Sequence, residues 1–69
     1  MKLTTVSPTY AIFPENNPRV VISITCAKLE DAIKSAHSLG HTPCQVEDNY
    51  ENKIYSLDEK GKVIKVRDK

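Results

Sequence analysis

Alternation of hydrophobic and polar residues predicts strands in the first third of the chain. Residues 9–13 are β-prone and aromatic, and they end at a turn cluster that contains two prolines. Along residues 19–25, Val20, Ile22 and Ile24 occupy every second position, so their side chains share one face. We therefore expect two half-buried strands that pair as a hairpin.

The hydrophobic period then changes from two residues to 3.6. Glu30 and Asp31 suit the N-terminal end of a helix dipole, and Gly40 suits the left-handed residue that follows a helix. We expect one amphipathic helix over residues 28–39. Its apolar stripe consists of Leu29, Ala32, Ile33, Ala36 and Leu39.

The rest of the chain favours strands again. A weak signal around Val46 predicts a strand over residues 44–48, and a stronger pattern predicts a hairpin of residues 53–57 and 62–66. Asp58 and Gly61 at the first and fourth turn positions favour a type I turn closed by a glycine bulge.

This turn predicts a register in which Leu57 pairs with Val63 and Ser56 pairs with Ile64. One face of the hairpin would then carry Ile54, Ser56, Ile64 and Val66. The opposite face would carry Lys53, Tyr55, Leu57, Val63, Lys65 and Arg67. A two-residue turn at Lys60 and Gly61 would instead group Tyr55, Leu57, Ile64 and Val66, but Lys-Gly is a poor sequence for such a turn.

The predicted fold class is α+β, a single ββαβββ domain over residues 1–69. We expect a mainly antiparallel sheet of four to five strands, with the helix packed on one face. A helix is about 10–12 Å across, whereas four or five strands span about 19–24 Å. One helix therefore leaves part of the sheet uncovered, and the set of Lys53, Tyr55, Leu57, Val63, Lys65 and Arg67 is the predicted partner-binding surface.

Composition narrows the class of protein further. A 69-residue chain with 39% hydrophobic residues should fold, and a net charge of +1 gives no general attraction to nucleic acid. Residues 1–8 lack the apolar run of a signal peptide, and no stretch reaches the length of a membrane span. Two cysteines are then expected as reduced thiols in the cytoplasm.

Cysteine and histidine residues provide the candidate zinc ligands. Cys26 and His37 lie at opposite ends of the predicted helix, about 16 Å apart, so they cannot share a zinc ion. A three-ligand site of His37, His41 and Cys44 stays possible, although Gly40 ends the helix between the histidines. We expect no metal and no cofactor.

Catalysis is not expected either. Cys26 precedes the helix, where its thiol could be activated, but both histidines lie at the far end. A crossover from one strand through the helix to the next places Cys44 at the opposite end of the sheet from Cys26, which argues against a Cys26–Cys44 disulfide. The acidic cluster of Glu47, Asp48 and Glu51 lacks the spacing of a calcium loop.

The leading hypothesis is a small non-enzymatic binding or regulatory module, such as an inhibitor or adaptor. It would act through the uncovered face or edge of its sheet on another protein or on a second copy, as a homodimer. The alternative is a nucleic-acid-binding module, because residues 53–69 carry six cations against three carboxylates, and Tyr55 among cations could stack on bases. No motif identifies a family.

Overall fold

The structure is a computed structural model that describes residues 8–69. Residues 1–7, which contain most of the stretch considered as a targeting signal, lie outside the described part. The secondary structure follows the predicted ββαβββ order of an α+β fold. Its elements are β1 (Thr9–Pro14), β2 (Ile22–Thr25), α1 (Leu29–Ser38), β3 (Cys44–Asp48), β4 (Lys53–Leu57) and β5 (Val63–Asp68).

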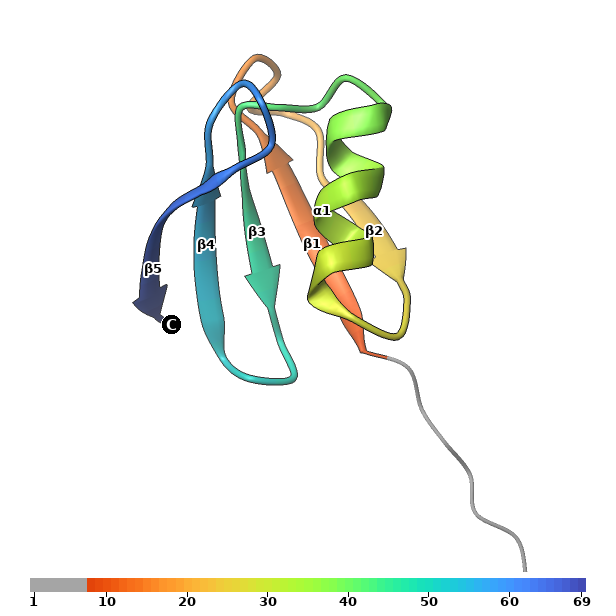
Figure 1. Cartoon of the computed structure of the whole chain (residues 1–69), viewed down its shortest axis with the longest axis vertical. Helices are drawn as coiled ribbons and strands as arrows, with labels where there is room; N and C mark the ends of the chain where they lie inside the picture. Colours follow the sequence, from red (N-terminus) through yellow and green to blue (C-terminus); the bar gives the residue numbers. More distant parts are fainter. Residues whose placement is uncertain (1–7) are drawn as a thin grey trace, which may run out of the picture.

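The five strands form one antiparallel sheet in the order β2-β1-β3-β4-β5 (Figure 1). Strand β1 lies between β2 and β3, which therefore run parallel to each other. The chain connects these two strands through α1, because parallel strands need a long crossover connection. The remaining strands follow as consecutive hairpins, and the hairpin of β4 and β5 is the one that the sequence predicts.

Helix α1 ends where the sequence predicts. Gly40 adopts a left-handed backbone with φ of 78°. Its N–H donates to the carbonyl of His37 at 3.0 Å, and the N–H of His41 donates to the carbonyl of Ala36 at 2.9 Å. These two bonds are the Schellman arrangement, which pairs carbonyl groups that the last helical turn leaves open.

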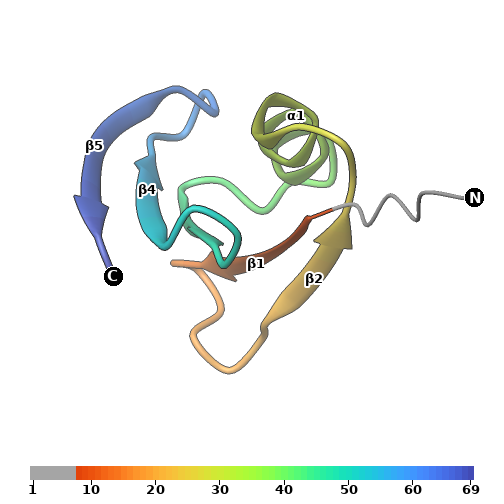
Figure 2. The same ribbon diagram turned by 90° about the horizontal axis from the view of Figure 1, so that it is seen from below.

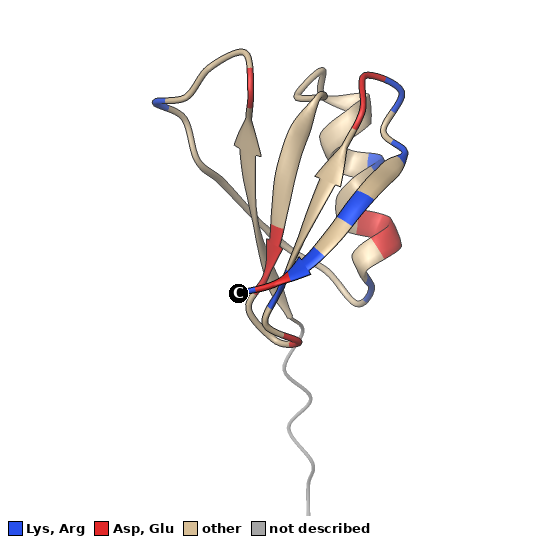
Figure 3. Ribbon diagram, turned by 90° about the vertical axis from the view of Figure 1, so that its left-hand side faces the viewer, with Lys and Arg blue, Asp and Glu red and all other residues tan. Residues whose placement is uncertain are grey.

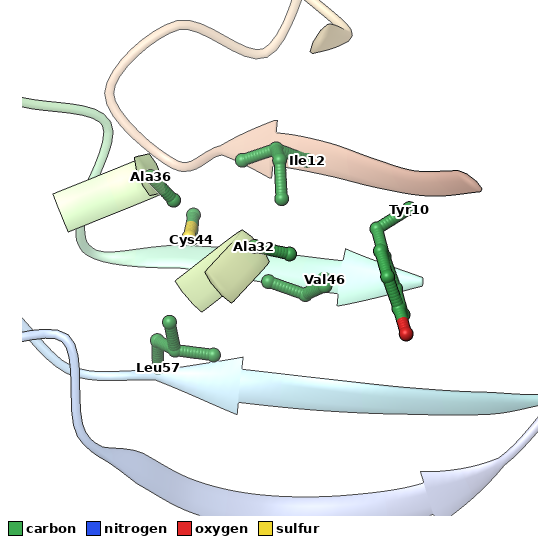
Figure 4. Packing of buried hydrophobic residues seen from close by; sticks show 7 residues of the cluster. All are labelled: Tyr10, Ile12, Ala32, Ala36, Cys44, Val46 and Leu57. Carbon is green, nitrogen blue, oxygen red and sulfur yellow. The ribbon is translucent and has the colours of Figure 1, made fainter. Parts of the chain in front are cut away.

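The hydrophobic core lies between α1 and the middle of the sheet (Figure 4). Alanine side chains of α1 face the sheet, which lets the helix approach β1 closely. Full burial of a side chain such as Ile12 stabilises the fold by about 1.5–3 kcal/mol. The buried hydrophobic residues are Tyr10, Ile12, Ala32, Ala36, Cys44, Val46 and Leu57.

The helix covers the sheet unevenly. It lies over the side formed by β1 and β2, while β5 curls away at the opposite edge (Figure 2). Burial falls in the same direction, since every residue of β5 is exposed except the half-buried Val63. The far edge of the sheet is therefore the least protected part of the described fold.

The register between β4 and β5 corrects the prediction. Leu57 pairs with Val63 as expected, but Ser56 then pairs with Lys65 and Tyr55 with Val66. Ile64 is an extra residue, inserted as a β-bulge between these pairs. The predicted pair Ser56–Ile64 is wrong, because one inserted residue moves every later side chain to the other face.

Candidate functional site

The structure divides the predicted partner-binding surface between the two faces of the sheet. Tyr55, Leu57 and Val63 lie on the side of α1, where Leu57 is only 1% exposed and belongs to the core. The alternation of β5 places Lys65 and Arg67 on the opposite face. The prediction that these residues form one uncovered face is therefore wrong, and the β-bulge is the reason.

Lys53, the sixth residue of that predicted surface, lies on the helix side with Tyr55. Its ammonium group is 3.4 Å from the carboxylate of Asp68, which follows from their pairing across β4 and β5. Both side chains are substantially exposed, so this ion pair contributes little to stability.

The outer face, opposite α1, is mixed rather than hydrophobic. Its apolar members Ala11, Phe13 and Ile54 are half-buried, and Glu47 separates Ala11 from Ile54 in the cross-strand row. Polar side chains thus occupy most of the surface that the helix cannot cover. The outward-facing strand residues are Thr9, Ala11, Phe13, Ser23, Thr25, Gln45, Glu47, Ile54, Ser56, Lys65 and Arg67.

The free side of β5 (Val63–Asp68), which we call the β5 edge, is the strongest candidate site. Among residues 8–69, β4 is the only strand that pairs with β5. Ile64 is 65% exposed and Val66 is 50% exposed. A strand that is paired on one side only and exposes apolar side chains is a template for another strand.

An apolar row on the helix side of the sheet reaches this edge. Each member pairs directly with the next, so the row crosses all five strands. Its members are Ile22, Ile12, Val46, Tyr55 and Val66. Ile12 and Val46 are fully buried, whereas Val66 at the end of the row is half exposed. The row therefore stops at an apolar residue with no neighbour on its outer side in the described chain.

The backbone N–H and C=O groups of β5 point alternately toward β4 and toward the free side of the strand. The N–H of Lys69 donates to the carbonyl of Asn52 at 3.0 Å, which makes this pair a hydrogen-bonded one. Such pairs alternate with non-hydrogen-bonded pairs along an antiparallel ladder. Arg67 therefore bonds toward β4, while the N–H and C=O groups of Val66 and Asp68 face the free side.

Two cations flank these free backbone groups on the outer face. Lys65 and Arg67 occupy alternate positions of β5. Figure 3 shows blue segments along the strand that ends at the C-terminus. The ion pairs of the described chain join Lys53 to Asp68 and Lys69 to Glu47. Lys65 and Arg67 therefore have no carboxylate partner among residues 8–69. The edge thus combines open hydrogen-bonding groups, an exposed valine and two unpaired positive charges.

The candidate metal ligands do not converge. Within residues 8–69, no three His, Cys, Asp or Glu side chains lie close enough together to hold a metal ion. The Cys26 thiol donates to the carbonyl of Lys28 at 3.2 Å. Cys44 is buried, and burial, with a smaller contribution from Glu15, raises the pKa of its thiol. Both cysteines are free.

His37 has a structural contact instead. Its Nδ1 lies 3.1 Å from the hydroxyl of Thr42, and that hydroxyl donates to the carbonyl of Glu59 at 2.9 Å. The Thr42 hydroxyl has one hydrogen, which it donates to Glu59, so Nδ1 of His37 must be the donor in its bond to the Thr42 oxygen. The three residues connect the end of α1 to the turn between β4 and β5.

The acidic cluster is a turn motif. One carboxylate oxygen of the buried Asp48 accepts the N–H groups of Tyr50 and Glu51, both at 2.9 Å. This arrangement is typical of an aspartate that begins a turn. The cluster thus closes the connection between β3 and β4.

The sequence predicts binding through the uncovered face or an edge of the sheet, but it does not identify β5 as that edge. The signal that could have found it is the alternation of Lys65, Val66 and Arg67, which suits a strand with one charged and one apolar face. The predicted register has no inserted residue at Ile64, so it places Lys65 and Arg67 on the face of Tyr55 instead of on the outer face.

Comparisons with protein-family models, curated proteins and solved structures found no match to this chain. Among the described residues, no helix is long and apolar enough to cross a membrane.

Proposed function

We propose that this protein is a small non-enzymatic module that binds another protein. A segment of that partner protein would be added to the sheet as a new strand at the β5 edge. The observation that carries this proposal is the exposed, one-sided pairing of β5. An extended segment placed there would bond to the open backbone groups of Val66 and Asp68. This mode of binding takes its affinity from the main chain and its specificity from alternate side chains.

The chemistry of the reactive side chains supports a binding role over catalysis. The raised pKa of Cys44 keeps its thiol protonated and unreactive. The Asp48 carboxylate is held by two backbone N–H groups. Two free thiols also support the proposal that the protein acts in the reducing cytoplasm.

The nucleic-acid alternative has less support than strand addition. It depended on an aromatic side chain among cations, and Tyr55 lies on the helix side while Lys65 and Arg67 face outward. Without Tyr55 beside them, these two cations lack the stacking platform that single-stranded bases need.

The proposal is tested by removing one open donor from the β5 edge. Val66→Pro removes an N–H that does not bond to β4, so the fold should persist, since edge strands tolerate proline at such positions. Ten-residue peptides selected from a random displayed library against the wild-type protein should lose at least tenfold in affinity for Val66→Pro. Fluorescence anisotropy of the labelled peptides measures this loss.

A matched control uses the other edge of the sheet. Val21 is also an exposed valine, 55% exposed, and it lies directly before β2. Val21→Pro should leave the affinity of the same peptides unchanged. Equal affinity for the wild type and Val66→Pro, with circular dichroism showing that both are folded, would contradict strand addition at β5.

A further inference from the structure

We infer that the segment bound at the β5 edge is an extended peptide in which acidic and apolar residues alternate. This inference rests on the proposed function and specifies the chemistry of the partner. An apolar residue of the partner lies opposite Val66, and acidic residues lie opposite Lys65 and Arg67. Side chains of a strand alternate between faces, so the two requirements fall on successive residues of the partner.

The helix side of the sheet sets the apolar requirement. Val66 ends the apolar row that runs from Ile22 across the sheet, and its direct neighbour in that row is Tyr55. Tyr55 is half-buried and packs against the core, whereas Val66 is 50% exposed. A β-branched or other apolar side chain opposite Val66 would extend the row by one strand and cover this valine.

The outer face sets the charge requirement. Lys65 and Arg67 lie two residues apart on the same face, and neither has an ion-pair partner among residues 8–69. Opposite charges directly across a strand pair are favourable, and like charges are unfavourable. Acidic residues at the two matching partner positions would therefore neutralise both cations at once.

A second copy of the chain does not meet this requirement. A two-fold antiparallel pairing of β5 with itself, centred on Val66, places Lys65 opposite Arg67 of the other copy. This contact occurs twice, so two pairs of like charges would face each other across the edge. The pattern of charges therefore favours a different, acidic chain over self-association.

Three labelled ten-residue peptides test this inference, namely alternating Glu-Val, alternating Thr-Val and alternating Lys-Val. Anisotropy titrations of the full chain should show that Glu-Val binds at least tenfold more tightly than Thr-Val and that Lys-Val does not bind. Binding of Glu-Val should weaken as salt increases, because exposed charges are screened. Hydrogen exchange followed by NMR should show new protection of the Val66 and Asp68 amides.

Charge reversal provides the matched variants. Lys65→Glu/Arg67→Glu should invert the preference, so that Lys-Val becomes the strongest ligand. Lys60→Glu/Lys62→Glu makes the same change in net charge within the turn before β5 and should leave the ranking unchanged. If this turn variant shifts the ranking equally, the attraction is a general effect of net charge and the inference is wrong.

The outcomes separate the inference from the proposed function. Protection of the β5 amides by Thr-Val with the same affinity as Glu-Val would overturn the acidic partner and leave strand addition intact. Failure of every peptide, including those from the random library, to protect Val66 and Asp68 would overturn both.

Discussion

Individual residues differ sharply in accessibility, and the two cysteines show what this difference means chemically. Cys44 is fully buried at the start of β3, and burial raises the pKa of its thiol. Cys26 is half-buried and donates to the backbone just before α1. The thiolate is the reactive form of cysteine, so the environment of Cys44 suppresses its reactivity through both access and ionisation.

We expect iodoacetamide to modify Cys26 of the folded protein well before Cys44. At pH 8, the rate at Cys26 should exceed that at Cys44 by at least tenfold, because Cys44 must wait for the core to open. Mass spectrometry of peptides from timed samples gives both rates. In 8 M urea the rates should become similar, and equal rates in the native protein would contradict the buried position of Cys44.

Elements depend on contacts at their ends as well as on their own hydrophobic pattern. The turn between β4 and β5 is held by the carboxylate of Asp58, which accepts the N–H groups of Lys60 and Lys62 at 2.9 Å. These bonds lower the pKa of Asp58, with the bond from Lys62 the larger cause. The same turn packs against the end of α1, since a Cβ atom at Gly61 would lie 3.0 Å from Cβ of His37.

Two glycine substitutions separate backbone strain from this contact between elements. Gly40 and Gly61 have similar left-handed φ values of 78° and 82°, but only Gly61 has a neighbour within 4 Å of its added Cβ. Gly40→Ala should therefore cost only the strain of the left-handed backbone, about 1–2 kcal/mol. Gly61→Ala should cost about 1–3 kcal/mol more, because His37 must move.

Urea unfolding followed by far-ultraviolet circular dichroism measures both free energies. Equal losses for the two variants would show that the turn does not press against α1. A further variant, Gly61→Ala/His37→Ala, removes the contacts with Cγ at 3.1 Å and Nδ1 at 3.3 Å but keeps the Cβ contact at 3.0 Å, so it should recover only part of the loss.

At the scale of the whole molecule, the sequence predicts the elements well and their final register less well. Periodicity locates the helix, and the bounds of β3 and β4 agree with the expected ones. The bulge at Ile64 has no such signal, because Val63 and Ile64 are both apolar and either can face the core. The observed register places Val66 beside Tyr55 and so completes the apolar row. This row is built from strands that lie far apart in the chain, so a local sequence pattern does not reveal it. The candidate site could not be placed from the sequence for the same reason.

The charge pattern of β5 also predicts how the molecule behaves toward its own copies. Natural edge strands avoid uncontrolled pairing by carrying charges, especially lysine, and by bulges, and β5 has both features. We expect that Lys65→Glu makes β5 complementary to itself. In the pairing centred on Val66, each introduced glutamate would lie opposite Arg67 of a second copy, so two repulsive contacts become two attractive ones.

Sedimentation velocity at low salt should show more dimer for Lys65→Glu than for the wild type, and 0.5 M NaCl should reduce the difference because the Debye length falls. Lys60→Glu, which alters net charge equally but lies in the turn, should sediment like the wild type. A wild-type chain that dimerises as strongly as Lys65→Glu would mean that these charges do not protect the β5 edge.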